Sequence, residues 1–186
     1  SSVPVRFADG TLVELRKPEL DISQLGYGDM HPDTRFSARI APPMIGLGLL
    51  EAIAEADILA AADPEDADGD GISGRANQVW DRAQQRSVLG RFGWKAGQPS
   101  LNQQNAEAFA NDMGLTSSLI PHDNCTAAQT DCLAAPHGGE PEVSDNILAS
   151  VLFYTRNLGV PARRNVDAPE VLKGKSLFHQ AGCQQC

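Results

Sequence analysis

The chain has 186 residues and a formal net charge of -9 at pH 7, with 41% hydrophobic and 5% aromatic residues. A chain of this length can bury one sizeable core, which aliphatic and small side chains must fill because aromatic residues are scarce. The acidic charge argues against a nucleic-acid partner and against binding to an anionic membrane surface. No segment approaches the roughly 20 apolar residues of a spanning helix, so we predict no membrane span.

The cysteines and the first residues of the chain give information about the cellular compartment of the protein. The chain begins SSVPV, without an initiator Met or an apolar signal region, and ends at Cys186. We interpret it as a processed protein or, more in keeping with the abrupt end, a piece of a longer one. Four cysteines in two local pairs are typical of an exported protein, so we predict a periplasmic or otherwise exported location.

The N-terminal segment predicts a β-hairpin followed by irregular structure. In residues 1–17, Asp9-Gly10 separates two short runs of alternating apolar residues, and glycine accepts the positive φ of a tight turn. Residues 18–42 are rich in Gly, Pro and Asp. They predict an irregular crossing.

A helical pattern begins at Pro43. Apolar residues recur there every three or four positions until Pro64 closes the pattern. Gly46 and Gly48 are unfavourable within a helix, so they indicate close backbone contact or a break.

An acidic segment follows, with three aspartates at alternate positions in DADGDGIS, residues 66–73. Alternate carboxylates, a glycine for the sharp turn and a following backbone carbonyl reproduce the first half of an EF-hand calcium loop. An EF-hand loop has a bidentate Glu at its twelfth position, where this sequence has Asn77. Asn77 itself or another oxygen ligand must therefore complete the site. The candidate calcium ligands are Asp66, Asp68, Asp70, Ile72, Asn77 and Asp81. The alternative is a solvated acidic turn.

Two further helices are predicted in the second half of the chain. Residues 100–114 begin with Ser100 in a capping box and end at Gly114. Residues 144–161 carry two adjacent apolar rows after Ser144, which is expected as the N-cap.

Cys125 and Cys132 close the short polar loop CTAAQTDC. In an oxidising compartment we expect a disulfide between them. A zinc site that adds His122 and His137 is the alternative.

The last segment, GKSLFHQAGCQQC, carries the chemistry of haem attachment. Cys183 and Cys186 have the spacing of the two thiols of a c-type haem motif, in which a histidine comes next. Gly174 allows close approach of another helix, and Leu177 and Phe178 offer apolar cover for a haem edge. We therefore predict haem attachment at these cysteines in the parent protein, and we expect the haem to be absent or incompletely held in this chain, which lacks the following histidine.

Three other interpretations of this CxxC remain open. A thioredoxin-type motif opens a helix after a buried strand, whereas here a helix, capped by Asp167 with Pro169 in its first turn, precedes the cysteines. A zinc site with His179 lacks a fourth ligand. A plain disulfide is the third.

Several segments together resemble the bacterial di-haem oxidoreductase family, which is related to di-haem cytochrome c peroxidases. They are RIAPPMIGLGLLEAI, DADGDGISGRAN, LGRFGWKAGQPSL, DMGLTSSLIP, CTAAQTDC, VPARRN and GKSLFHQAGCQQC. Members of the family resemble exported proteins with two CxxCH sites. The resemblance implies electron transfer or peroxide reduction, and of the family's haem-attachment positions it transfers only Cys183 and Cys186. Related peroxidases also bind calcium near the haem interface.

We predict a mainly α fold, a helical cytochrome c-like segment with a small N-terminal β-hairpin and long irregular loops. The expected parts are the hairpin (1–17), the crossing (18–42), a helical core (43–160) with a calcium-type loop (66–81), and the truncated start of a c-type haem domain (161–186).

The functional hypothesis is a fragment of an exported di-haem c-type cytochrome, inactive alone. Its expected partners are a redox protein or a small oxidant such as peroxide, and the rest of its own chain with the other haem domain. The alternatives are a calcium-stabilised scaffold without enzymatic activity and a dithiol redox protein that uses Cys183 and Cys186.

Overall fold

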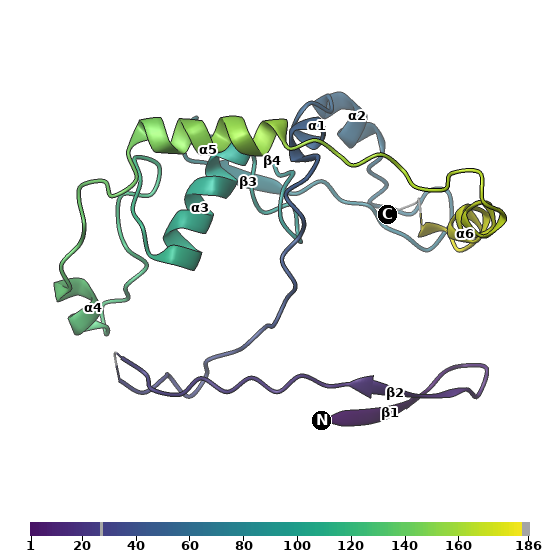
Figure 1. Ribbon diagram of the computed structural model, residues 1–186, viewed down its shortest axis with the longest axis horizontal. Helices are drawn as coiled ribbons and strands as arrows, with labels where there is room; N and C mark the ends of the chain where they lie inside the picture. Colours follow the sequence, from purple (N-terminus) through teal and green to yellow (C-terminus); the bar gives the residue numbers. More distant parts are fainter. Residues whose placement is uncertain (27, 184–186) are drawn as a thin grey trace. The chain divides into compact units, whose positions relative to one another are not determined.

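The computed structural model describes residues 1–26 and 28–183 of the chain (Figure 1). They fall into two compact units, residues 1–41 with 125–136 and residues 42–124 with 137–183. Within this part of the chain, no helix has the length and apolar character needed to cross a bilayer. The elements are β1 (Ser2–Arg6), β2 (Leu12–Arg16), α1 (Leu47–Glu51), α2 (Glu55–Ala60), β3 (Gln78–Asp81), β4 (Arg86–Leu89), α3 (Leu101–Met113), α4 (Thr130–Ala134), α5 (Asp145–Asn157) and α6 (Pro169–Gln180).

The prediction of a mainly α fold overstated the helical content. Helices cover less than a third of residues 1–26 and 28–183, and two small antiparallel strand pairs accompany them there. Three of the six helices in the described residues are only five or six residues long. The 17 glycines and 12 prolines give the physical reason, since both residues interrupt helices. The division into four parts stays a prediction.

The first unit contains the predicted hairpin. β1 pairs antiparallel with β2, with Val5 opposite Val13. Between them Gly10 has φ 89°, and Asp9 Oδ1 accepts a hydrogen bond from the backbone N–H of Thr11 at 2.9 Å. The Asp-Gly pair therefore makes the turn for which its chemistry is suited. The described residues of the following crossing, 18–26 and 28–42, contain no helix or strand.

The helical pattern after Pro43 forms two short helices rather than one. Gly46, the residue before α1, has φ 78°, and Ala54, the residue before α2, is extended. Gly48 lies against α5, because a Cβ built on it would be 2.1 Å from the carbonyl oxygen of Arg156. The close backbone contact that the glycines indicated is present at Gly48, whereas the interruption between the two helices lies at residues 52–54, after both glycines.

Helices α3 and α5 pack together at the centre of the second unit. The hydroxyl of Ser100 accepts from the N–H of Gln103 at 3.3 Å, and that of Ser144 accepts from Ile147 at 3.4 Å. Both predicted caps are therefore confirmed, and Gly114, with φ 67°, ends α3. The buried apolar cluster of this unit consists of Ala106, Ile120, Val143 and Leu148.

A second hairpin, of β3 and β4, is not indicated by the sequence pattern. Its strands are four residues long, and in each the two apolar residues are adjacent rather than alternating, so the pattern carries little strand signal. Gln103 of α3 holds the hairpin: its buried amide accepts from the N–H of Arg82 at 2.8 Å and donates to the carbonyl of Trp80 at 3.0 Å. Arg82, in the turn of the hairpin, also donates from its guanidinium to Glu107 of α3 at 3.2 Å, so both side-chain contacts connect the hairpin to the helix.

Glu51, at the end of α1, joins three helices. Its Oε1 accepts from the N–H of Leu101 at the start of α3 at 3.1 Å, and its Oε2 accepts from the guanidinium of Arg156 on α5. Partial burial works to raise the pKa of Glu51. The hydrogen bonds and the charges of Arg156 and Arg91 outweigh burial and hold that pKa below its usual range.

Replacing Glu51 by glutamine is expected to lower the free energy of unfolding by about 1–2 kcal/mol at pH 7, because hydrogen bonds to a charged group are lost. A carboxyl with a depressed pKa stabilises the fold above its unfolded pKa, and this contribution disappears as the pH falls through the folded value. Urea unfolding should therefore show a smaller difference between wild type and variant at about pH 3 than at pH 7. Exposed Glu55→Gln is the control, and a pH-independent difference would contradict the assignment.

Candidate functional site

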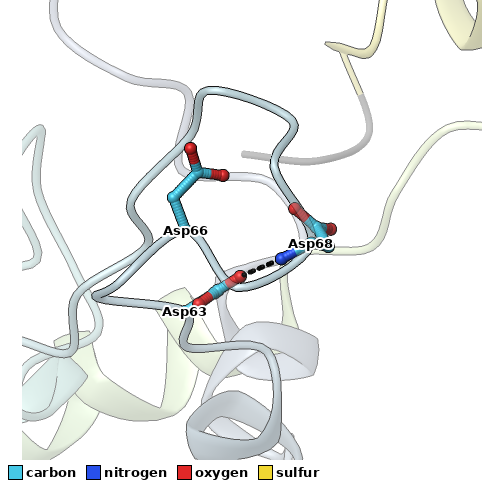
Figure 2. Close-up of side chains that lie close together, drawn as sticks. All are labelled: Asp63, Asp66 and Asp68. Atoms are coloured by element: carbon cyan, nitrogen blue, oxygen red, sulfur yellow. Dashed lines mark hydrogen bonds between the residues drawn. The ribbon is translucent and has the colours of Figure 1, made fainter.

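Three carboxylates gather in the loop after α2. One oxygen from each of Asp63, Asp66 and Asp68 lies within 4.8 Å of the others, and Figure 2 shows the three side chains around one turn of the backbone. Asp63 and Asp66 are half-buried, and Asp68 is exposed. Among the described residues, this is the only group of three or more His, Cys, Asp or Glu side chains placed closely enough to hold a metal ion.

Backbone hydrogen bonds shape this loop. Asp63 forms an isolated bridge with Gly74, which closes the base of the loop. Its carboxylate accepts from the N–H of Ala67 at 2.8 Å and from that of Asp68 at 3.4 Å, the contact drawn in Figure 2. Asp66, with φ 51°, accepts from the N–H of Gly71 at 3.1 Å. The loop therefore orders its acidic side chains through its own backbone.

The structure groups only part of the predicted ligand set. Asp66 and Asp68 belong to the cluster, whereas Asp70 lies outside it and accepts from the N–H of Ile72 at 2.7 Å. Ile72, whose backbone carbonyl is the predicted calcium ligand, is half-buried.

The two most distant candidate ligands have structural roles. The amide of Asn77 donates to the carbonyls of Lys95 and Ala96 at 3.0 and 3.1 Å. Asp81 is buried and caps the turn of the second hairpin, where it accepts from the N–H groups of Ala83 and Gln84 at 2.9 Å. Neither residue belongs to the acidic cluster.

Sequence reasoning missed Asp63. Asp63 lies directly before Pro64, at the end of the predicted helical segment. It does not belong to the series of alternating aspartates that begins at Asp66. The available signal was an acidic side chain three residues before the first aspartate of the alternating run. The bridge to Gly74 brings it to the cluster, and this contact cannot be read from spacing.

Oxygen ligands of this kind suit a hard divalent cation such as calcium. Three carboxylates within 4.8 Å repel one another in the absence of a counter-charge. The donor set therefore fits calcium, although three carboxylates alone supply fewer than the usual 6–8 ligands.

The local cysteine pair lies in the first unit. Cys125 and Cys132 are joined, with their Cα atoms 5.8 Å apart, and Cys132 belongs to α4. This arrangement favours the disulfide over the zinc alternative.

The terminal helix leads to Cys183, the first of the two cysteines that the sequence predicts as haem-attachment points. α6 begins at Pro169, but its N-cap is Ala168 rather than the predicted Asp167, and this cap makes no side-chain hydrogen bond. Proline supplies a helical φ at the first position, so a side-chain cap is not required to start the helix. Cys183 is exposed, while Cys186, the other predicted attachment point, lies outside the described residues.

The face of α6 near Cys183 is apolar and open. Leu177 and Phe178 are 53% and 51% exposed. A Cβ built on Gly174 would have no neighbour within 4 Å among the described residues. A reachable thiol beside an uncovered apolar surface is what covalent attachment of a flat apolar group requires.

Comparison with protein families supports this interpretation. The model of a family described as "di-haem oxidoreductase, putative peroxidase" matches residues 2–186. The chain therefore belongs to the di-haem oxidoreductase family, as the resemblance indicated. Searches of curated proteins and of solved structures gave no match. Membership in this family implies a haem cofactor and redox chemistry.

Proposed function

We propose that this chain works in an exported di-haem c-type cytochrome that transfers electrons and reduces peroxide. The match to the di-haem oxidoreductase family along residues 2–186 carries this proposal. The exposed thiol at the end of α6 supports it. The paired cysteines of the first unit are compatible with export, since disulfides persist in oxidising compartments.

Cys183 and Cys186 would hold the haem. Each thiol adds across one vinyl group: a carbon–sulfur bond forms, and the thiol proton passes to the neighbouring vinyl carbon. Leu177 and Phe178 would cover the edge of the porphyrin and exclude water from it. When bound, the haem supplies a redox-active iron. Reduction of peroxide consumes two electrons, delivered by a redox partner protein, and two protons, and it yields two molecules of water.

The first test is covalent haem content. The complete gene product, expressed with haem-attachment machinery, should show a c-type absorption spectrum that survives denaturation and extraction with acidified solvent. Cys183→Ser together with Cys186→Ser should remove one of the two covalent haems, because no thiol remains at that motif while the other haem site is unchanged. Cys125→Ser with Cys132→Ser removes the two cysteines of the disulfide, away from that motif, and should retain both haems.

If the doubly substituted terminal motif keeps its full complement of covalent haem, these cysteines are not the attachment points. Peroxidase activity is then read separately, as peroxide-dependent oxidation of a reduced donor with two electrons consumed per peroxide. If the haem-loaded protein does not reduce peroxide, the peroxidase part of the proposal is wrong and only electron transfer remains.

The acidic loop binds calcium in this proposal, and its role is to stabilise the second unit. Asp63, Asp66 and Asp68 supply the first oxygens, and the remaining ligands come from backbone carbonyls or water. The support is the approach of three carboxylates to within 4.8 Å in a loop ordered by its own hydrogen bonds.

Calcium at about 100 times its dissociation constant should stabilise the fold by about 2.7 kcal/mol, and chelator should remove the effect. In Asp66→Asn with Asp68→Asn, calcium should no longer raise the melting temperature. In chelator, that variant should be at least as stable as wild type, because like charges have been removed. Asp57→Asn, on exposed α2, is the control, and a wild-type melting temperature unmoved by calcium would exclude the site.

A further inference from the structure

Nearly all of the net negative charge comes from one stretch of the chain. Eight of the 24 Asp and Glu residues fall between Ile40 and Gly74, where the sequence has no Lys, Arg or His. The rest of the chain carries 16 acidic residues against 15 Lys and Arg, so it is close to neutral. The eight are Glu51, Glu55, Asp57, Asp63, Glu65, Asp66, Asp68 and Asp70.

This stretch forms α1, α2 and the acidic loop, all within the second unit. Glu51 is directed toward Arg156, so its charge is neutralised locally. Five of the other carboxylates are exposed, and they extend along α2 and the loop: Glu55, Asp57, Glu65, Asp68 and Asp70. Among the described residues, unpaired negative charge is therefore concentrated on this part of the second unit.

The same helices expose apolar side chains. Gly48 and Glu51 lie on the side of α1 that contacts α5. Successive residues of a helix are rotated by about 100°, so Leu49 and Leu50 lie on the opposite side. They are 67% and 48% exposed, and Leu59 on α2 is 42% exposed.

We propose that the surface formed by the exposed leucines of α1 and α2 and by the carboxylates of Glu55, Asp57, Glu65 and Asp70 docks a small, basic electron-transfer protein. We call it the α1–α2 surface. The inference rests on the proposed function, since it identifies the chemistry of the redox partner. An apolar centre with a charged rim is the usual composition of a transient protein interface.

Charge complementarity favours a basic protein as the partner that binds the α1–α2 surface. A basic partner is steered to the acidic stretch, and its lysines meet carboxylates at the rim. A second copy of this chain would bring the same acidic stretch and be repelled. An acidic redox protein or a nucleic acid would be repelled for the same reason.

The test measures binding of mitochondrial cytochrome c, a small basic electron-transfer protein, to the complete haem-loaded gene product by calorimetry. Chelator is present throughout, so that calcium does not offset the acidic charges. The test variant combines Glu55→Gln, Asp57→Asn and Glu65→Gln, which leaves the three clustered aspartates unchanged. The control variant removes the same charge elsewhere and combines Glu19→Gln, Asp21→Asn and Asp29→Asn, all exposed residues of the first unit.

The test variant should bind about 5- to 20-fold more weakly at low ionic strength, and the difference should fall below about 2-fold near 0.5 M salt as screening takes over. The control variant should change binding less than about 2-fold. Equal weakening in both variants would overturn the proposal, because the total charge rather than the α1–α2 surface would then control binding. An unchanged test variant would overturn it too.

The contribution of the exposed leucines to binding is tested with a separate pair of variants. Leu49→Ser should weaken binding about 5-fold at every salt concentration, because apolar burial is not screened. Leu133→Ser, a similarly exposed leucine on α4, should not. A Leu49 effect no larger than the Leu133 effect would overturn the docking surface. Covalent haem content is recorded for each protein, so failure of docking is distinguished from failure of the proposed function.

Discussion

Gly48→Ala is expected to lower the free energy of unfolding by about 3 kcal/mol, because overpacking a tight contact forces backbone to move. The new Cβ would lie 2.1 Å from the carbonyl oxygen of Arg156 and 3.0 Å from its Cα. These neighbours are backbone atoms of α5, which cannot rotate away as the end of a flexible side chain can. The helix must therefore shift, and the Glu51 contact with Arg156 should weaken with it.

Gly174→Ala in α6 is the matched control. A Cβ there would have no described atom within 4 Å, so alanine should be neutral or stabilise by up to about 1 kcal/mol through its helix propensity. Urea unfolding of both variants measures the comparison. Equal losses in the two variants would show that the contact with α5 is not the cause.

Gln103→Leu is expected to lower the free energy of unfolding by about 1–2 kcal/mol, since leucine matches the size of glutamine but leaves two part-buried backbone groups without this partner. The N–H of Arg82 and the carbonyl of Trp80 both lose the amide that satisfies them. Hydrogen exchange should show faster exchange in β3 and β4, while the amides of α5 keep their protection.

Gln104→Leu makes the same chemical change at the next position, where the side chain is only half-buried. It should change stability by less than about 0.5 kcal/mol. If Gln103→Leu leaves both stability and the exchange of the second hairpin unchanged, the hairpin is held by contacts other than this amide.

Local chemistry made several elements predictable. Ser100 and Ser144 cap their helices, because a hydroxyl reaches a backbone N–H only two or three positions away. Gly10 allows the turn of the first hairpin for an equally local reason. The family was also recognisable in short segments, and its match covers residues 2–186.

Other features depend on residues far apart in the chain. Glu51 meets Arg156 across 105 positions, and Gln103 reaches the second hairpin across more than 20. No spacing rule predicts such pairs, since packing of α1 and α5 creates the first and packing of the hairpin on α3 creates the second. Asp81 illustrates the consequence, because the turn uses a carboxylate whose sequence position suggested a calcium ligand.

The acidic cluster combines both kinds of information. The order of residues alone provides the alternating carboxylates, the flexible glycines and the concentration of negative charge between residues 40 and 74. The folded chain adds Asp63, because the bridge between Asp63 and Gly74 closes the loop and carries that carboxylate to Asp66 and Asp68. Caps, turns and charge arise from neighbours in the chain, whereas a ligand set arises from loop closure, which costs entropy that tertiary contacts must offset.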